Sequence, residues 1–424
     1  LLQAVVTMGP TGRIGIVVQT IHKFLINLKR QQPDLFGTLP AGLVERYLPE
    51  KALGCFSMVK PSESEKTLTS VCQDLLQLIQ SLAGHDEVLF MSSFQLLHRV
   101  FKEQCVVKET SSGQVELLIK SAKDVGVDSL QNPSDPEAGY SGNKGQGYQV
   151  QVMETYSEQE GALSLITYAE AEPACAHDVY ALIPALEDTQ SRALQPELVL
   201  ADTAYGSEDN REQAQARGVE LIAPVMGSLS EGRLPLFAFT FSDQGEVLNC
   251  PAGHQPFKTT QKKDRHRAFF VTELCKACPQ QDCCPTKAGK DHRYLGYYQK
   301  AFRVARRRQW QQTEAFQKRY RYRAGIEAAF SALDRKMGIK HLRVRGLKAV
   351  RYCVHLKAAA MNIFRASAIQ MRKKAKRIAQ KAALASRNLC RLFIKEPLMN
   401  VSIFPRTLES PGAVDYQNCL SWAA

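Results

Sequence analysis

Leu198-Val199-Leu200-Ala201-Asp202-Thr203-Ala204-Tyr205-Gly206 is the stretch that decides the fold. Four apolar residues in a row are typical of a short strand that is buried within a parallel sheet. Such a strand delivers Asp202 to its carboxyl end, the edge at which α/β sheets hold their ligands. Asp202 could instead cap the helix expected over 207–217, and the stretch alone favours neither interpretation.

The segments around this stretch indicate an α/β protein. Alternating residues predict a strand at 148–152 with a hairpin partner at 163–168, and a further strand is expected at 221–225. Helical spacing predicts helices between these strands, so we expect a mixed sheet with flanking helices. Residues 13–105 have the apolar spacing of helices and give a mainly helical N-terminal region.

Glu327 is a second acidic residue in an unusual setting, because almost every charged residue near it is basic. Positions three, four and seven apart lie on one face of a helix. The residues that share this face are Tyr320, Arg323, Glu327 and Asp334. We expect Glu327 to point from a buried helix into a basic cleft. The alternative is a structural ion pair with Arg323, four residues before it.

Positive charge is concentrated in one part of the chain. The 424 residues include 55 Lys and Arg and 42 Asp and Glu, which gives a net charge of +13. Residues 300–381 hold 24 of the basic and 3 of the acidic residues, so this stretch carries +21 and the remainder −8. A field of one sign attracts a polyanion, and we expect nucleic acid rather than a bland basic surface.

Composition limits the class of protein. With 44% hydrophobic and 23% charged residues, the chain has the composition of a globular protein, which excludes disordered and fibrous classes. It contains no run of the roughly 18 to 20 apolar residues that a membrane-spanning helix needs, and its first residues lack a signal-peptide pattern. We therefore expect a cytoplasmic, nucleoid-associated protein without membrane contact.

The two acids predict a metal site. Carboxylates that converge inside a positive DNA-binding surface would repel phosphate unless divalent cations lay between them. Oxygen ligands of this kind suit Mg²⁺ or Mn²⁺, and such ions stabilise the attacking and leaving oxygens of phosphoryl transfer. We expect Asp202 and Glu327 to hold Mg²⁺ or Mn²⁺.

Cysteines between positions 250 and 284 predict a structural zinc site. Cys250-Pro251-Ala252-Gly253-His254 and Cys275-Lys276-Ala277-Cys278 resemble the tight turns that present ligands to a tetrahedral ion. The expected ligands are Cys250, Cys275, Cys278 and Cys283, with His254 or Cys284 as substitutes. Zinc would hold together an insert that is too polar to form its own core. The alternatives are reduced cysteines that pack as small hydrophobic residues, or a relic of a lost site.

Together these motifs resemble the DDE transposases of bacterial insertion sequences, in the branch with a Cys-rich insert. The resemblance covers most of residues 130–365. It rests on Ala201-Asp202-Thr203-Ala204-Tyr205-Gly206, on Tyr320-x2-Arg323-x3-Glu327, on the Cys-rich insert, and on the segment from Asn132 to Gln151. It implies an RNase H-like fold in which Asp202 is the second acidic ligand and Glu327 the third. The residues expected to bind DNA are Tyr320, Arg323, Arg335, Lys336, Lys340, Arg343 and Arg345.

Two departures from the family's pattern matter. Seven residues after Glu327 the family has a Lys, whereas this chain has Asp334, so a contact with the DNA backbone is displaced or lost. The first Asp of the triad is not recognisable at the end of a first strand, and we expect a chain truncated at its N-terminus. Asp135 is the fallback catalytic candidate, although an ordinary turn residue before Pro136 is the preferred interpretation.

We expect five regions along the chain. They are a mainly helical region (1–125), an RNase H-like core (126–226), a Cys-rich zinc-ribbon-like insertion (227–295), core-completing helices with Glu327 (296–367), and a basic helix with an irregular tail (368–424). The expected function is Mg²⁺-dependent cutting and joining of double-stranded DNA at the ends of a mobile element, by a homodimer that holds both ends. The alternative is a truncated, inactive transposase remnant that still binds DNA.

Overall fold

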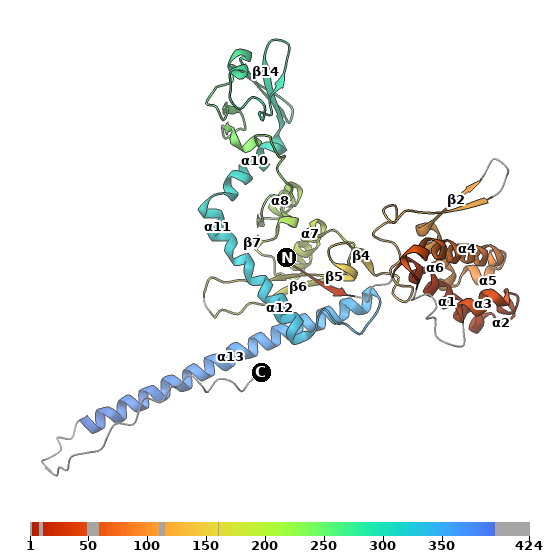
Figure 1. Ribbon diagram of the computed structural model, residues 1–424. Coiled ribbons are helices and arrows are strands. Elements are labelled where there is room, and N and C mark those ends of the chain that lie inside the picture. Colours follow the sequence, from red (N-terminus) through yellow and green to blue (C-terminus); the bar gives the residue numbers. More distant parts are fainter. Residues whose placement is uncertain (1, 8–11, 49–58, 110–114, 160, 395–424) are drawn as a thin grey trace, which may run out of the picture. The chain divides into compact units, whose positions relative to one another are not determined.

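The computed structural model describes residues 2–7, 12–48, 59–109, 115–159 and 161–394 (Figure 1). The chain divides into two compact units, Leu1–Ala366 and Ser367–Ala424. No helix within the described ranges has the length and apolar character needed to cross a membrane. The chain is of the mixed α/β class, as expected.

Helices fill the first part of the chain and enclose a core of their own. They are α1 (Arg13–Gln31), α2 (Pro33–Gly37), α3 (Ala41–Tyr47), a 3₁₀ turn η2 (Pro61–Glu63), α4 (Ser64–Leu82), α5 (Asp86–Leu89) and α6 (Ser92–Gln104). Their apolar faces meet around Phe24, Leu75 and Phe94, which are fully buried. The helices predicted over residues 13–105 are confirmed.

Arg13 joins the two ends of this helical region. Strands β2 (Cys105–Glu109) and β3 (Val115–Ile119) form an antiparallel hairpin that returns the chain to the start of α1. Arg13 Nε donates to Gln104 Oε1 at 2.7 Å, and its Nη2 donates to the carbonyl oxygen of Lys120 at 2.9 Å. The chain therefore enters and leaves the helical region at one place.

An antiparallel sheet follows, with β5 (Gly145–Glu154) at its centre. β5 pairs with β1 (Leu2–Thr7), β4 (Gly139–Ser141) and β6 (Ile166–Pro173). The predicted strand at 148–152 is confirmed and is longer than expected. Its hairpin partner lies further along the chain than predicted, because small residues such as Ala171, which is fully buried, continue the strand without an apolar signal.

The parallel strand that ends before Asp202 is confirmed, but the single mixed sheet is wrong. β7 (Leu198–Leu200) pairs in parallel with β8 (Glu220–Ile222), and α8 (Glu208–Ala216) lies between them in the chain. Within the described ranges these two strands bond only to each other. β7 and the end of β5 instead line opposite parts of a cavity of about 300 Å³. Before β7 come the 3₁₀ turn η3 (Asp178–Tyr180) and α7 (Leu182–Ser191).

The Cys-rich segment has a small core, which corrects the expectation that it is too polar to form one. A four-stranded antiparallel sheet has the order β11-β12-β14-β13. Its strands are β11 (Lys258–Lys262), β12 (Arg265–Phe270), β13 (Lys287–Ala288) and β14 (Arg293–Tyr298), after a 3₁₀ turn η5 (Leu236–Ala238) and the pair β9 (Thr240–Phe241) and β10 (Val247–Asn249). Phe239, Phe270 and Leu295 are buried together, although loops separate them in the sequence.

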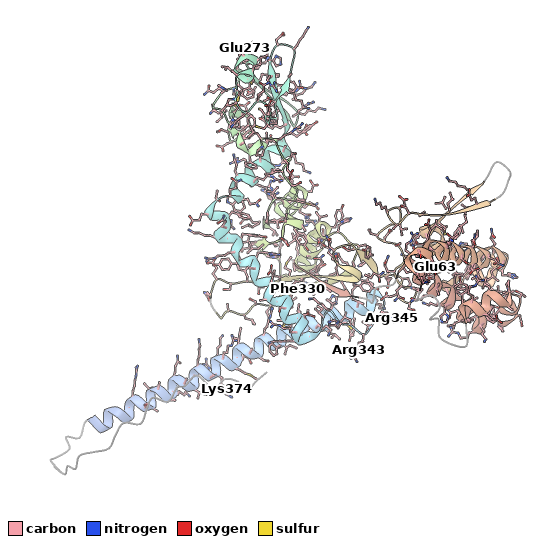
Figure 2. All side chains as sticks on the ribbon, viewed as in Figure 1. Glu63, Glu273, Phe330, Arg343, Arg345 and Lys374 are labelled. Carbon is pink, nitrogen blue, oxygen red and sulfur yellow. The ribbon has the colours of Figure 1, made fainter. Side chains whose placement is uncertain are left out.

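Helices complete the first unit. They are α10 (Gln299–Gln311), α11 (Glu314–Tyr320), a 3₁₀ turn η6 (Arg321–Ala324), α12 (Gly325–Met337) and the start of α13 (Leu347–Ile394), and α9 (Thr272–Lys276) precedes them. Ile326, Phe330 and Leu333 of α12 share one buried core with Tyr148 and Val150 of β5. Figure 2 labels Phe330 on this helix. The face that carries Glu327 thus lies on a helix anchored to the sheet, with a 3₁₀ turn where an unbroken helix was expected.

The described part of the second unit is the later portion of α13. The predicted basic helix over 370–381 is confirmed as helix, and its basic side chains are exposed, including Lys374 (Figure 2). α13 contains twelve Lys and Arg residues and no Asp or Glu. This helix therefore carries charge of one sign only.

The start of α13 is anchored by two carboxylates from the segment before β5. Asp135, which is 2% exposed, accepts hydrogen bonds from the Tyr148 hydroxyl and, at 3.1 Å, from the Gly346 amide. Glu137 Oε2 accepts from the Leu347 amide at 2.8 Å. Carboxylates at a helix N-terminus satisfy its free amides and complement its dipole.

Glu208 is the most heavily paired buried charge that the structure describes. Its side chain is 1% exposed and accepts hydrogen bonds from Arg211, Arg303 and Arg307, with distances of 3.1, 2.7 and 3.2 Å. Burial has the largest effect on the pKa of Glu208 and raises it, but the bonds from the arginines together outweigh burial and lower this pKa. Glu208 thereby ties α8 to α10.

Replacing Glu208 by Gln should lower the free energy of unfolding by about 3 kcal/mol at neutral pH, because three guanidinium groups lose their buried partner. A lowered pKa means that this stabilisation is complete above the usual Glu pKa of about 4.3 and is lost as the pH falls through the folded-state value. Urea unfolding at several pH values measures both effects. Glu212→Gln is the control, since Glu212 is 47% exposed and should cost less than about 1 kcal/mol. Equal losses in the two variants would contradict this account.

Replacing Asp135 by Ala should cost about 2 kcal/mol, because the Tyr148 hydroxyl and the Gly346 amide are left without their acceptor. Asp128→Asn, at an exposed position, should change stability by less than about 0.5 kcal/mol. Thermal and urea unfolding measure the difference. Unchanged stability in Asp135→Ala would argue against the anchoring role.

Candidate active site

Asp202 and Glu327 meet at one guanidinium group. Arg323 Nη2 donates to Asp202 Oδ2 and Arg323 Nη1 donates to Glu327 Oε1, both at 2.9 Å. The side chains of Asp202 and Glu327 are 45% and 60% exposed, whereas that of Arg323 is 18% exposed. Two carboxylates far apart in the sequence are therefore held at one accessible place by a half-buried cation.

Asp202 follows β7, as expected, and begins a short turn, but it does not cap the helix after it, because Ser207 caps α8. Its Oδ1 accepts a hydrogen bond at 2.8 Å from the amide of Thr203, the first residue of the 3₁₀ turn η4 (Thr203–Tyr205). Gly206 ends this turn against the carbonyl oxygen of Pro224, and a Cβ at position 206 would lie 1.8 Å from that oxygen. The turn can pack in this way only because residue 206 has no side chain.

Glu327 lies in the first turn of α12, and the ion pair with Arg323 considered from the sequence is present. The structure adds Asp202 to that pair, which the spacing on one helix could not reveal. Glu327 is exposed rather than enclosed by a buried helix, so its predicted setting is corrected in that respect.

Tyr320 lies beside the same group of charges. Its ring stacks on Phe316, with 5.1 Å between the centroids. Burial raises the pKa of the Tyr320 hydroxyl, Arg323 lowers it, and Asp202 and Glu327 raise it. The hydroxyl therefore stays protonated near the carboxylates and can donate a hydrogen bond.

Asp135 shares no contact with Asp202, Glu327 or Arg323 among the described side chains. Its hydrogen bonds join β5 to the start of α13 instead. The arrangement favours the structural interpretation of this residue over the catalytic one.

The basic residues expected to bind DNA differ in their surroundings. Arg343 and Arg345 are exposed in the segment between α12 and α13 (Figure 2), and Arg335 is exposed near the end of α12. Lys340 pairs with Asp334 at 3.2 Å, and the Lys336 ammonium lies 3.7 Å from the centroid of the Phe364 ring. Asp334 thus neutralises a neighbouring lysine.

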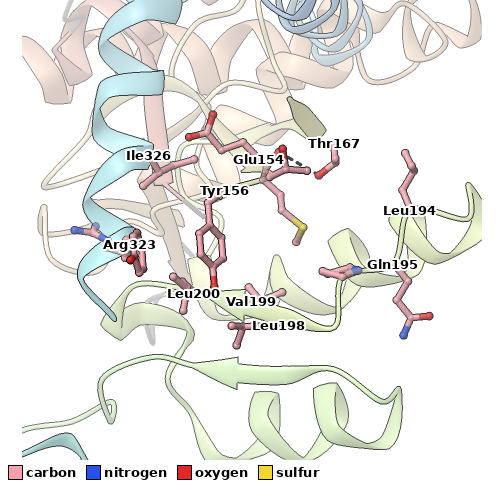
Figure 3. A pocket seen from close by; sticks show the side chains of 14 residues that line it. Glu154, Tyr156, Thr167, Leu194, Gln195, Leu198, Val199, Leu200, Arg323 and Ile326 are labelled. Carbon is pink, nitrogen blue, oxygen red and sulfur yellow. Dashed lines mark hydrogen bonds between the residues drawn. The ribbon is translucent and has the colours of Figure 1, made fainter. Parts of the chain in front are cut away.

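The cavity of about 300 Å³ beside Arg323 was not anticipated from the sequence. Figure 3 shows Tyr156 and the side chains of β7 around it, with Arg323 at its edge. The Tyr156 ring stacks on Tyr322 with 5.5 Å between centroids. Tyr156 lies in a loop and Tyr322 in a basic 3₁₀ turn, and nothing in the sequence around either residue predicts this contact.

A buried polar chain leads from β5 towards Asp202. Gln149 and Gln151 of β5 are fully buried, and Tyr205 donates to Gln151 Oε1 at 2.5 Å. Asp178 accepts from Lys144 at 2.9 Å instead of capping the helix after it. The signal that could have revealed this chain is the pair of Gln residues at alternate positions of an otherwise apolar strand.

Cysteines of the Cys-rich segment gather around a second, smaller cavity. Cys250, Cys275, Cys278 and Cys284 line it together with His254, whereas Cys283 is not among its described lining residues. The described cysteines are free of disulfides. Across the described residues, no three His, Cys, Asp or Glu side chains are already arranged to hold a metal ion, which applies to the carboxylates as well.

Comparisons with known proteins find one similarity, which covers the Cys-rich segment and the helices after it. Residues 249–366 match the family model described as "Transposase DDE domain"; the match includes the four cavity-lining cysteines and Glu327 but not Asp202. A search of curated proteins and a search of solved structures each find no match. The match to the family model supports transposase function in general. The resemblance drawn from the motifs is confirmed over residues 249–366, which are similar to the DDE domain of transposases.

Proposed function

We propose that this chain cuts and joins double-stranded DNA at the ends of a mobile element, using Mg²⁺ or Mn²⁺ held by Asp202 and Glu327. The observation that carries the proposal is the convergence of these carboxylates on Arg323, which lies 121 positions from Asp202. A core built for another purpose would have no need to bring two exposed acids together inside a basic region.

The donor set fits a hard divalent cation. Asp202 and Glu327 offer carboxylate oxygens at a point that already accommodates one positive group, and both side chains are open to solvent. When bound, the metal would activate a water or a 3′-hydroxyl and stabilise the charge that develops on phosphate oxygens. Arg323 holds both acids in place and reduces their repulsion of a DNA phosphate, and it competes with the metal for their oxygens.

The order of elements supports an RNase H-like core. β5 and β6 form an antiparallel hairpin, β1 lies antiparallel to β5, and β7–α8–β8 forms a parallel crossover unit. In this interpretation Asp202 follows the fourth core strand and Glu327 lies on the helix that packs on the sheet. The Cys-rich segment is then an insertion between the second and third acids.

DNA would be held by exposed basic residues that follow Glu327 in the chain. Arg335, Arg343 and Arg345 have no acidic partner in the contacts of the described residues, and α13 adds charge of the same sign. We propose that two chains act together, since two element ends must be joined in one reaction.

A second candidate function is DNA binding by a chain that lacks catalysis. The observation that favours it is the sequence of β1, Leu2–Thr7, which lies where the resemblance requires the first acid and contains no Asp or Glu. The first acidic residue of the chain is Asp34. Two carboxylates hold divalent metal less well than three, so we expect the rate of cutting to be low.

Asp202→Asn and Glu327→Gln should each abolish Mn²⁺-dependent nicking of the DNA that flanks the coding sequence, while DNA affinity changes by less than about threefold. Each substitution removes a metal ligand but leaves the basic surface intact. Asp334→Asn, which lies on α12 outside the pair, is the control and should keep the wild-type rate. Nicking at the wild-type rate by Asp202→Asn would refute the assignment, and DNA binding without any wild-type nicking would establish the second candidate.

Arg323→Ala should raise the affinity for Mn²⁺ about fivefold, because a guanidinium that competes for both carboxylates is removed, at the modest strength of partly exposed ion pairs. Enhancement of the water-proton relaxation rate by protein-bound Mn²⁺ measures this affinity without DNA. Arg321→Ala is the matched control, since Arg321 contacts Tyr322 and not the acids. Weaker Mn²⁺ binding by Arg323→Ala would show that the arginine supports the metal site instead of competing with it.

A further inference from the structure

Four cysteine side chains from three separate turns line one small cavity in the Cys-rich segment. The cavity has a volume of about 20 Å³, and its sulfur-bearing residues are Cys250, Cys275, Cys278 and Cys284. A space of this size accommodates about one water molecule or one metal ion. Cys275 and Cys278 belong to the end of α9 and the turn after it, while Cys250 and Cys284 follow β10 and precede β13.

The backbone around Cys250 has the form that presents a thiolate to a metal. The His254 amide donates to Cys250 Sγ at 3.3 Å, and the Cys250 amide donates to the His254 carbonyl at 2.9 Å. Gly253 closes this turn at φ +83°, a conformation that L side chains rarely adopt. An amide directed at sulfur stabilises its anionic form, which is the form that binds metal.

Neighbouring cysteines 283 and 284 have different surroundings. Cys284 lines the cavity beside Thr286, whereas the Cys283 thiol donates to the Gln280 carbonyl at 3.3 Å. The turn thus directs Cys284, and not Cys283, towards the other three sulfurs. In the ligand set expected from the spacing alone, Cys284 therefore replaces Cys283.

Arg293 supplies the charge that such a site needs. Four thiolates around Zn²⁺ carry a net charge of −2, and the Arg293 side chain lines the same cavity. Its Nε donates to Thr286 Oγ1 at 3.2 Å and its Nη2 to the Thr286 carbonyl at 3.0 Å. The guanidinium is fixed beside the sulfurs by these two bonds.

We propose that Cys250, Cys275, Cys278 and Cys284 bind one structural Zn²⁺, with release of their thiol protons to solvent. The turns that carry these four cysteines already surround the cavity, and the proposal requires their side chains to direct the sulfurs towards its centre. Four protein ligands leave no open position, so the ion stabilises the Cys-rich segment and takes no part in DNA cleavage. Cys283 is not a ligand.

The experiment compares adjacent cysteines in the full chain purified under reducing conditions. We expect about one zinc per chain in the wild type and in Cys283→Ser, and less than about 0.2 in Cys284→Ser, because three thiolates bind zinc far more weakly than four. Replacing zinc by Co²⁺ should give tetrahedral thiolate absorption bands in the first two proteins only. Absence of metal from the wild type, or loss of metal in Cys283→Ser with retention in Cys284→Ser, would overturn the proposal.

A second measurement does not depend on folding of the variants. Alkylation of the wild-type chain, followed by mass spectrometry, should find the four cavity cysteines protected with zinc and modified after chelation, while Cys283 reacts in both cases. Equal reactivity of Cys284 with and without chelator would also overturn the proposal, as would disulfides among these cysteines in the reduced preparation.

Discussion

Two ionised carboxylates that lie close together repel each other, and a cation between them offsets this repulsion, which is the constraint that shapes the candidate active site. Arg323 supplies that cation, and it can do so because three parts of the fold agree. β7 and the turn closed by Gly206 fix Asp202, α12 fixes Glu327 by packing on β5, and η6 places Arg323 between them. Glu208 also stabilises this arrangement. Its partner Arg307 donates a second hydrogen bond, of 3.2 Å, to the carbonyl oxygen of Gly206 in the turn after Asp202.

Local features of the site could be predicted from the sequence. The apolar run before Asp202 predicted a parallel strand, and the spacing of Arg323 and Glu327 offered their ion pair as the alternative that the structure contains, because both depend on neighbours within a few residues. The contact between Asp202 and Arg323 depends on the packing of α12 against the sheet and has no local signal. The same holds for the break between the two groups of strands, since pairing between distant strands is a tertiary property.

The density of basic residues in the sequence was the least reliable predictor of which residues form a free, positively charged surface. The basic block was counted as one polyanion-binding region, yet Arg303 and Arg307 of α10 pair with Glu208, and Arg319 forms two hydrogen bonds of 2.7 Å with Glu220. Acids from outside the basic region therefore neutralise several of its residues between Lys300 and Arg319. Under the proposed function, the later portion from Arg335 onwards is left to bind DNA. The partners of Asp135, the fallback catalytic candidate, also lie on distant elements and have no local signal in the sequence.

The hydrogen bonds by which Arg13 joins the two ends of the helical region have a consequence for the order of folding. β1 pairs with β5 with Leu2 opposite Val152, so the chain must close a very long loop before this part of the sheet exists. Loop-closure entropy and high contact order both delay such pairing. If the α1–α6 bundle folds first and Arg13 joins its two ends, the loop that must still close between β1 and β5 becomes much shorter. Weakening the hydrogen bonds of Arg13 should then slow assembly of the sheet far more than it lowers the stability of the folded helical bundle.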